Sequence, residues 1–250
     1  MNLHTDIESL DFDDCLRPAF AKTLLHELLN RRNSINLTGD TGQGKSRMLE
    51  DLKRMENRLG IKIALVNLKD FRRNYEGFLM DLAMQLGLPN IHFQRFEGLL
   101  DAIHTQVQMT CLILVDNLEV LNEYPSNHQL YDDHFVSSLN NLKNKNHIRL
   151  ACASRDWLKK VVFQHETSLL ELHQLEMPDL HDKEIDAEIR RRCPALAAAH
   201  RAELRKSIRD FSQTTKRLDF FLRKALAHYD PKKFPAQLKT WTAAYETENG

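Results

Sequence analysis

The feature that most restricts the fold of this chain is a glycine-rich segment lying between a predicted strand and a predicted helix. The segment reads Gly39-Asp40-Thr41-Gly42-Gln43-Gly44-Lys45-Ser46. Glycines allow successive backbone N–H groups to curl around an anion, and the N-terminus of the following helix adds partial positive charge. We therefore expect Lys45 to contact the β- and γ-phosphates of a nucleotide and the Ser46 hydroxyl to bind Mg²⁺.

The segments around this loop alternate between strand and helix patterns up to Pro178. Apolar residues spaced three and four apart predict helices over 18–32, 45–59, 71–86, 93–107 and 136–142. Short apolar runs predict strands over 35–38, 61–66, 111–115, 148–153 and 168–175. The polar residues 122–133 are expected to form a loop. The uninterrupted apolar run at 111–115 is typical of a parallel strand covered on both faces. An α/β fold with a parallel five-stranded sheet flanked by helices follows.

Beyond Pro178 the sequence predicts helices only, over about 182–192, 197–211 and 215–228. We therefore expect three parts: an acidic N-terminal segment over 1–16, a nucleotide-binding α/β domain over 17–178, and a small all-helical domain over 179–250. The last part includes a basic region, because residues 199–240 carry eleven Lys or Arg against four Asp or Glu.

Asp116 ends the apolar run of the central strand. A carboxylate at the C-terminal end of a parallel strand would face the phosphate loop, where it can hold Mg²⁺ directly or through water. The alternative is that Asp116 caps the following helix, and the two roles are compatible. We expect Ser46 and Asp116 to be the metal-binding pair.

The residue after Asp116 is Asn117, and Glu119 follows two positions later. An amide cannot act as a general base at neutral pH, so Asn117 cannot activate water. We therefore expect ATP hydrolysis to be slow or to depend on Glu119.

The strand over 148–153 is followed by Ser154 and Arg155. A fixed cation near the γ-phosphate can distinguish a triphosphate from a diphosphate, because it gains most from the additional charge. Ser154 or Arg155 could occupy that position, and the alternative is that Arg155 is a surface residue at the strand end.

Three segments together resemble the STAND (NB-ARC-like) branch of the AAA+-related ATPases: Thr38–Arg47, Leu112–Glu119 and Ala153–Arg155. The first two are similar to Walker A and Walker B motifs. The resemblance implies nucleotide contacts along Gly39–Arg47, ATP as the nucleotide, and a sheet in which the 148–153 strand lies between the strands of the two motifs. The Gly-x-Pro motif common in the family's lid is absent, and the winged helix and repeat array of STAND regulators do not follow.

The resemblance also implies a helical lid over the nucleotide with an arginine that senses phosphate. Arg217 in the segment Thr215–Leu222 is similar to that arginine, with Lys216 as a second candidate and an exposed helix cation as the alternative. We therefore expect Arg155 and Arg217 to act with Asp116 and Glu119 during turnover.

Composition excludes several other classes of protein. No apolar run approaches the roughly 18 residues of a membrane span, and the polar N-terminus is unlike a signal peptide. The four cysteines are widely separated, which is typical of reduced cytoplasmic core residues. No zinc-ligand spacing and no Gly-x-Ser-x-Gly motif occurs. A cytoplasmic protein without a membrane partner is expected.

The expected function is that of an ATP-binding switch, which binds ATP or ADP and engages a protein partner, or a second copy of itself, in one nucleotide state. Aromatic residues interleaved with the basic 199–240 region could bind DNA or could form the core of an amphipathic helical domain. A non-hydrolysing adaptor and a DNA-dependent ATPase of a mobile-element or anti-phage defence system are the alternative functions.

Overall fold

The computed structural model of the chain describes residues 7–88, 92–123, 131–142, 145, 147–162, 167–209 and 214–249. The chain divides into two compact units. The first comprises Met1–Gly39 and Lys45–Met177, and the second comprises Asp40–Gly44 and Pro178–Gly250. Residues 124–130, which include most of the loop expected over 122–133, lie outside the described residues, as does Phe211.

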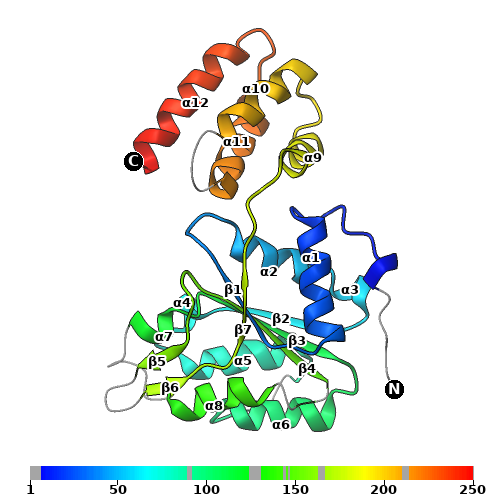
Figure 1. Cartoon of the computed structure of the whole chain (residues 1–250), viewed down its shortest axis with the longest axis vertical. Coiled ribbons are helices and arrows are strands. Elements are labelled where there is room, and N and C mark those ends of the chain that lie inside the picture. The colour runs from blue at the N-terminus through cyan, green and yellow to red at the C-terminus, as the bar shows by residue number, and fades with distance from the viewer. Residues whose placement is uncertain are drawn as a thin grey trace. The chain divides into compact units, whose positions relative to one another are not determined.

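The first unit is built on a five-stranded parallel sheet in the order β2-β3-β4-β1-β7 (Figure 1). Its strands are β1 (Ile35–Thr38), β2 (Lys62–Asn67), β3 (Cys111–Asp116), β4 (Ile148–Ala153) and β7 (His173–Glu176). This sheet confirms the predicted α/β fold class, and β4 lies between β1 and β3 as the resemblance implied.

Two apolar layers cover the sheet, one on each face. Along β3, Leu112 and Leu114 belong to the layer that contains residues of α1 and α2, whereas Ile113 and Val115 belong to the layer that contains residues of α5, α6 and α8. All four side chains are fully buried. This two-sided burial explains why β3 is continuously apolar instead of alternating with polar residues.

The helices of the first unit differ from the predicted ones mainly at their ends. They are α1 (Pro18–Leu25) with a π-helical turn (His26–Asn30), α2 (Lys45–Arg54), α3 (Glu56–Leu59), α4 (Leu68–Phe71), α5 (Tyr75–Gln85), α6 (Phe96–Gln106), α7 (Val120–Glu123) and α8 (Asp133–Asn141), preceded by a short 3₁₀ turn (Ile7–Ser9). The helix predicted over 45–59 is broken at Met55 and ends at Gly60, whose φ of 62° is the left-handed cap that glycine favours.

A two-stranded antiparallel hairpin that the sequence did not predict follows β4. It consists of β5 (Lys160–Val162) and β6 (Thr167–Leu169), so the N-terminal half of the strand predicted over 168–175 pairs with β5 instead of joining the sheet. Asn122 of α7 binds β5 through both atoms of its amide, donating to Lys160 O at 2.9 Å and accepting from Val162 N at 3.0 Å.

The described residues of the second unit form four helices: α9 (Asp182–Arg192), α10 (Ala198–Arg209), α11 (Thr214–His228) and α12 (Phe234–Asn249). Three were predicted, and α12 was missed. Its buried residues recur at helical spacing: Phe234, Leu238, Trp241 and Tyr245. The aromatic residues Phe220, Phe221 and Trp241 are also buried, so they serve as core and not as a nucleic-acid surface. Within the described residues, no helix combines the length and apolar character needed to cross a bilayer.

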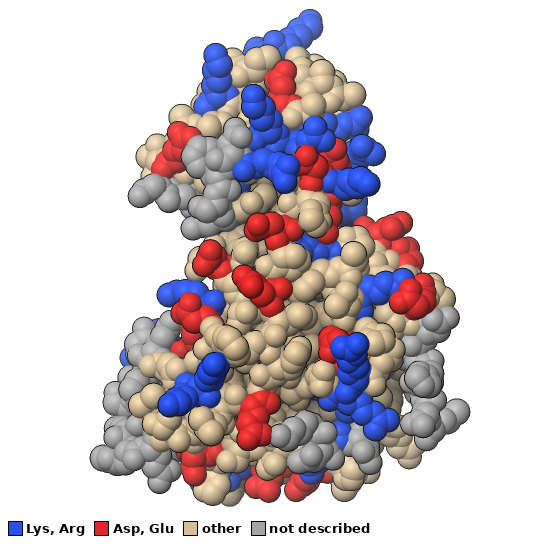
Figure 2. Space-filling view, in the orientation of Figure 1, with Lys and Arg blue, Asp and Glu red and all other residues tan. Residues whose placement is uncertain are grey.

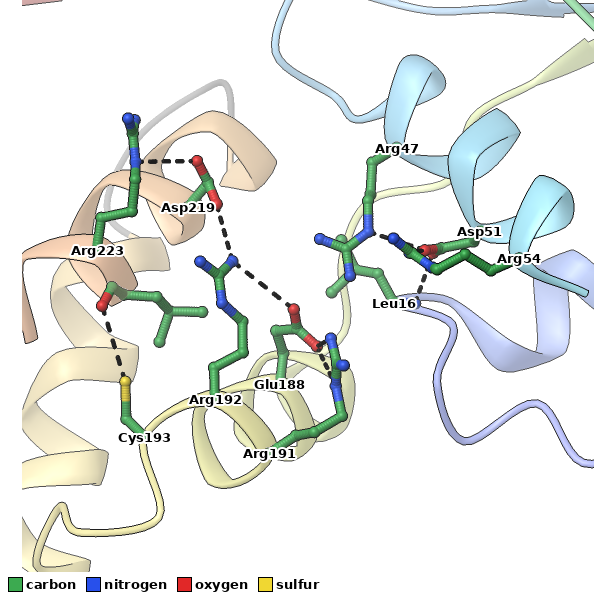
Figure 3. Close-up of polar contacts among 11 residues, drawn as sticks. Leu16, Arg47, Asp51, Arg54, Glu188, Arg191, Arg192, Cys193, Asp219 and Arg223 are labelled. Atoms are coloured by element: carbon green, nitrogen blue, oxygen red, sulfur yellow. Dashed lines mark hydrogen bonds and ion pairs between the residues drawn. The ribbon is translucent and has the colours of Figure 1, made fainter. Parts of the chain in front are cut away.

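Asp51 connects α2, the helix that begins in the phosphate loop, to the segment before α1 (Figure 3). Its carboxylate is almost fully buried and accepts hydrogen bonds from Leu16 N and Arg47 Nε, both at 2.8 Å, and from Arg54. A buried carboxylate is stable only when its partners satisfy it, and removing one partner of such a network leaves the others uncompensated.

We predict that Asp51→Ala lowers the free energy of unfolding by about 3 kcal/mol, because it removes the buried acceptor of the Leu16 N–H and of Arg47 Nε. Urea denaturation measures this change. Glu50→Ala, which removes an exposed acid from the same helix, is the control and should change stability by less than about 0.5 kcal/mol. Equal effects of the two substitutions would contradict the assigned role of Asp51.

Candidate functional site

The glycine-rich segment forms a tight loop between β1 and α2. Gly39, Gly42 and Gly44 have φ values of 145°, 85° and 97°, which residues with a Cβ adopt only at a cost. Within the loop, the Gln43 N–H donates to Asp40 O at 3.2 Å. Positive φ angles such as those of Gly42 and Gly44, two residues apart, turn backbone N–H groups toward a common centre, which is the geometry of an anion-binding loop.

Lys45 and Ser46 occupy the first turn of α2. The Lys45 ammonium donates to Gly39 O and therefore lies back over the start of the loop. The Ser46 hydroxyl is hydrogen-bonded to the carboxylate of Asp116 at the end of β3. The structure thus brings the loop lysine, the serine hydroxyl and the carboxylate to one edge of the sheet.

Burial is the main influence on Asp116, and it raises the pKa of this carboxyl above its ordinary value. The Ser46 hydroxyl, the Asn117 N–H at 2.9 Å and the positive charge of Lys45 act in the opposite direction by stabilising the ionised form. Glu119 raises the pKa of Asp116 further through like-charge repulsion. Asp116 is therefore a carboxylate whose ionisation is opposed in the protein alone and would be favoured by a cation.

Asn117 has a structural role that sequence reasoning missed. Its φ of 57° is left-handed, a conformation that Asn tolerates better than most residues. Its amide donates to Asn67 Oδ1 at 2.8 Å at the end of β2, and the next backbone N–H, of Leu118, donates to Ala153 O of β4 at 2.8 Å. Asn117 therefore fixes the turn after Asp116 against the ends of two neighbouring strands, and the only sequence signal was the residue type itself.

Glu119 lies close to Asp116 and is largely buried. Its Oε1 is 3.7 Å from the Lys69 ammonium. Its Oε2 is buried and accepts no hydrogen bond from the described residues. A carboxylate with one buried oxygen free to accept a proton can act as a general base.

Arg155 follows β4 at the same edge of the sheet. Its side chain is exposed, and its carbonyl accepts a hydrogen bond from the Gly39 N–H at 3.2 Å, which joins its turn to the start of the phosphate loop. Ser154, the alternative candidate for phosphate contact, is 1% exposed and its hydroxyl is directed to Asn36 and to the Asp156 carbonyl. Of the two candidates, Arg155 is the one available to a ligand.

Arg217 is not an exposed helix cation, which was the alternative to its predicted role. The side chain is 1% exposed within the second unit, where Nε donates to Ser207 O at 2.6 Å and the guanidinium lies 4.9 Å from the Tyr245 ring and 5.4 Å from the Phe221 ring. These contacts lie within the second unit, and the role of Arg217 in sensing phosphate stays a prediction. Arg217 is buried partly because Tyr245 of α12 covers it, and α12 was not predicted from the sequence.

Arg47 donates from its Nε to Asp51 at 2.8 Å, and its contact with the nucleotide stays a prediction. Sequence reasoning placed it among the nucleotide contacts. The structure gives it a role in fastening α2, as described above.

Two carbonyl groups of the phosphate loop are bound by the start of α11, which belongs to the same compact unit as Asp40–Gly44. The Thr215 hydroxyl donates to Gln43 O at 2.8 Å, and the Lys216 N–H donates to Gly42 O at 3.1 Å. The Lys216 side chain is exposed. Sequence reasoning gave Thr215 no role, although a threonine at the start of a helix is a common hydrogen-bonding residue.

The oxygen donors of the site suit a magnesium ion. Mg²⁺ prefers oxygen ligands and is commonly held by one or two protein groups together with phosphate oxygens. The hydrogen-bonded Ser46 hydroxyl and Asp116 carboxylate are donors of this kind, and each lies next to the phosphate loop. The residues present therefore fit the ion.

The cysteines do not offer an alternative nucleophile. All four are buried thiols, and burial raises the pKa of Cys111 to about 12 and of Cys15 to about 11. A thiol with such a pKa is protonated at neutral pH and is a poor nucleophile.

Comparison with known proteins is consistent with this geometry. A model of the AAA domain family matches residues 28–162, more than half of the chain. No curated protein matches the chain significantly.

Three solved structures illustrate the shared fold. ORC1 of Aeropyrum pernix in complex with DNA is 14% identical with a TM-score of 0.61, covering 98% of this chain and 68% of that chain. Drosophila ORC bound to DNA is 19% identical with a TM-score of 0.55, covering 94% and 64%. AMPPCP-bound DnaA from Aquifex aeolicus is 14% identical with a TM-score of 0.54, covering 95% and 69%.

This chain spans 64% to 69% of the length of these three proteins, and identities this low establish the fold alone. The family match covers the phosphate loop, Asp116, Glu119 and Arg155. The chain belongs to the AAA domain family.

Proposed function

We propose that the protein is an ATP-binding, Mg²⁺-dependent ATPase that works as a nucleotide-operated switch. The observation that carries the proposal is the hydrogen bond between the Ser46 hydroxyl and the Asp116 carboxylate, next to a phosphate loop that begins α2. Loop amides and Lys45 would bind the phosphates of ATP or ADP, and Ser46 and Asp116 would hold Mg²⁺.

Hydrolysis is proposed to be slow or to be stimulated by a partner. Asn117 cannot accept a proton and is engaged with Asn67, so it leaves Glu119 as the residue to activate water. The buried Oε2 of Glu119 supports this role, whereas its separation from Asp116 by two residues, instead of the direct succession found in many related ATPases, supports a low basal rate. A non-hydrolysing adaptor remains the alternative.

Arg155 is proposed to sense the γ-phosphate, since its exposed side chain leaves a turn bonded to the start of the loop. In the second unit, we assign the phosphate-sensing role to Lys216 instead of Arg217. The Lys216 side chain is exposed, and its backbone N–H binds the phosphate loop at Gly42. A switch of the STAND type, which engages a protein or a second copy of itself in one nucleotide state, is the finer form of this proposal.

DNA is a second candidate partner, favoured by the charge of the second unit. Figure 2 shows Lys and Arg side chains gathered over this unit on the face in view. Several are neutralised: Arg205 by Asp186 at 2.6 Å and Arg209 by Asp182 at 3.0 Å. Others have no acidic partner among the described residues, namely Arg190, Lys206, Lys232 and Lys239. Unpaired cations of this kind bind DNA phosphates in a salt-dependent manner.

We predict that Lys45→Ala weakens Mg·ATP binding about 100-fold, because it removes a charge-assisted contact to the phosphates. Asp116→Ala should retain ATP binding in EDTA but lose the increase in affinity that Mg²⁺ gives. Titration with a fluorescent ATP analogue measures both. Lys22→Ala, which removes a surface lysine paired with Glu8, should behave as the wild type. Unaltered Mg·ATP affinity in the first two variants would refute the assignment.

We predict that Asp116→Asn makes the protein without metal and nucleotide more stable at pH 7. The folded state holds the Asp116 proton more tightly than the unfolded chain, so this group lowers the free energy of unfolding as pH rises from its ordinary pKa of 3.8 through the raised value. Above that window the destabilisation is fully present, and the amide removes it.

Thermal melts in EDTA from pH 4 to 8 measure the difference between wild type and Asp116→Asn. The difference in melting temperature in favour of the variant should grow with pH and then level off. In separate melts without EDTA, adding Mg²⁺ should increase the stabilisation by ATP in the wild type only. A variant that is less stable than the wild type at pH 7 in EDTA would show that burial does not oppose the ionisation of Asp116.

We predict that Glu119→Gln reduces phosphate release at least about 100-fold while nucleotide binding is retained, since it removes the general base but keeps the shape. Steady-state phosphate release, with and without DNA and at two salt concentrations, measures this effect. Turnover that Glu119→Gln leaves unchanged would exclude Glu119. No turnover in the wild type, with nucleotide tightly bound, would favour the adaptor, and stimulation by DNA only at low salt would favour the DNA-dependent enzyme.

A further inference from the structure

Three polar side chains meet in the sheet of the first unit, two from the strands β1 and β7 and one from the turn after β4. Asn36 lies in the middle of β1 and is 0% exposed, Ser154 follows β4 and is 1% exposed, and Gln174 lies in β7 and is half-buried. Asn36 and Gln174 are register partners on neighbouring strands. Among the described residues, the hydrogen bonds of these three side chains go to one another and to the carbonyls of Asp156 and Leu172, and not to the phosphate loop.

These side chains form a chain of hydrogen bonds with a defined direction. The Asn36 amide donates to Gln174 Oε1 and to Ser154 Oγ, each at 2.8 Å, which uses both of its protons. Ser154 has a single hydroxyl proton, and its shortest acceptor is Asp156 O at 2.6 Å, with Asn36 Oδ1 more distant at 3.2 Å. Gln174 in turn donates to Leu172 O at 3.0 Å.

The series of hydrogen bonds therefore ends at the backbone of the turn that carries Arg155. The bond from Ser154 Oγ to Asp156 O spans Arg155, and two further bonds fix the same turn: Ser154 N to Leu37 O at 2.9 Å, and Gly39 N to Arg155 O at 3.2 Å. The backbone of Arg155 is held from both sides, while its side chain remains exposed.

An asparagine in the middle of a buried strand lowers the stability of the folded state. Its amide must be desolvated, and Asn has a low preference for strands. Side chains alternate between the two faces of a strand, so Asn36 lies on the face opposite to its neighbours Ile35 and Leu37. Its register partner in β4, Cys152, is fully buried in the apolar layer that contains residues of α5, α6 and α8, so an apolar side chain at position 36 would suit this layer. A fully satisfied buried network offsets that cost and fixes one arrangement of the groups it joins.

We propose that Asn36 is a positioning residue for Arg155: by joining β7 and β1 to the Ser154–Asp156 turn, it holds the arginine where it distinguishes ATP from ADP. This inference rests on the proposed function, because it assumes that Arg155 senses the γ-phosphate. Asn36 acts only through the turn and touches no ligand.

The test is the ratio of the dissociation constants of Mg·ADP and a non-hydrolysable Mg·ATP analogue, measured by calorimetry. We compare the wild type with Asn36→Leu, Arg155→Ala and the double variant, and follow stability by thermal melts. The wild type should prefer the ATP analogue. Asn36→Leu should reduce this preference about tenfold with little change in ADP affinity, since hydrogen bonds to charged groups are worth at least that factor. In the Arg155→Ala background, Asn36→Leu should have no further effect on the ratio.

Gln85→Leu is the matched control. The Gln85 amide also binds a strand, accepting from Leu65 N and donating to Leu65 O, both at 3.0 Å, but on the opposite edge strand, β2. It should lower stability and leave the nucleotide ratio unchanged. If Asn36→Leu does not fold, Asn36→Asp, which keeps the shape but loses both amide donors, and Ser154→Ala provide the same comparison.

A loss of stability in Asn36→Leu with an unaltered nucleotide ratio would overturn the inference, as would an equal reduction of the ratio in the Arg155→Ala background. A wild type that binds both nucleotides without preference would also overturn it, while leaving nucleotide binding intact. A wild type that binds neither nucleotide would refute the proposed function itself.

Discussion

The hydrogen bond between the Ser46 hydroxyl and the Asp116 carboxylate is the contact on which the rest of the site depends. It joins the first turn of α2 to the end of β3, two elements separated along the chain by β2, α5 and α6. Lys45 is placed beside it by the same helical turn, and Glu119 by the turn that follows β3. Groups that would bind phosphate, hold a cation and activate water are thus brought together by one parallel sheet.

This arrangement destabilises the folded protein, as is common at functional sites. Asp116 is buried with its pKa raised, Glu119 repels it, and Asn117 adopts a left-handed conformation directly after it. Each feature opposes folding slightly, and a bound cation would relieve the first two. The apolar layers on both faces of β3 and the Asp51 network behind α2 supply the stability that offsets these features.

The sheet and the phosphate loop could be predicted from the sequence because their signals are local: an apolar run, a glycine pattern and the order of elements. The roles of Arg217 and Asn36 could not, because their partners are distant in the chain. Arg217 contacts Tyr245 of α12, and Asn36 bonds Ser154 and Gln174, which are 118 and 138 residues away. From the sequence, Asn117 was interpreted only as a residue that cannot act as a general base, because the residue type does not reveal its left-handed backbone conformation.

The most direct test of the account is to locate the cation. Crystals grown with Mn²⁺ and a non-hydrolysable ATP analogue would reveal the metal by anomalous scattering. The account predicts one manganese site with the Ser46 hydroxyl as a ligand, at about 2.0–2.2 Å as for similar divalent ions, with Asp116 binding it directly or through one water, and with the triphosphate enclosed by the loop from Gly39 to Lys45. A metal and triphosphate bound away from Ser46, with Asp116 contacting neither, would contradict it.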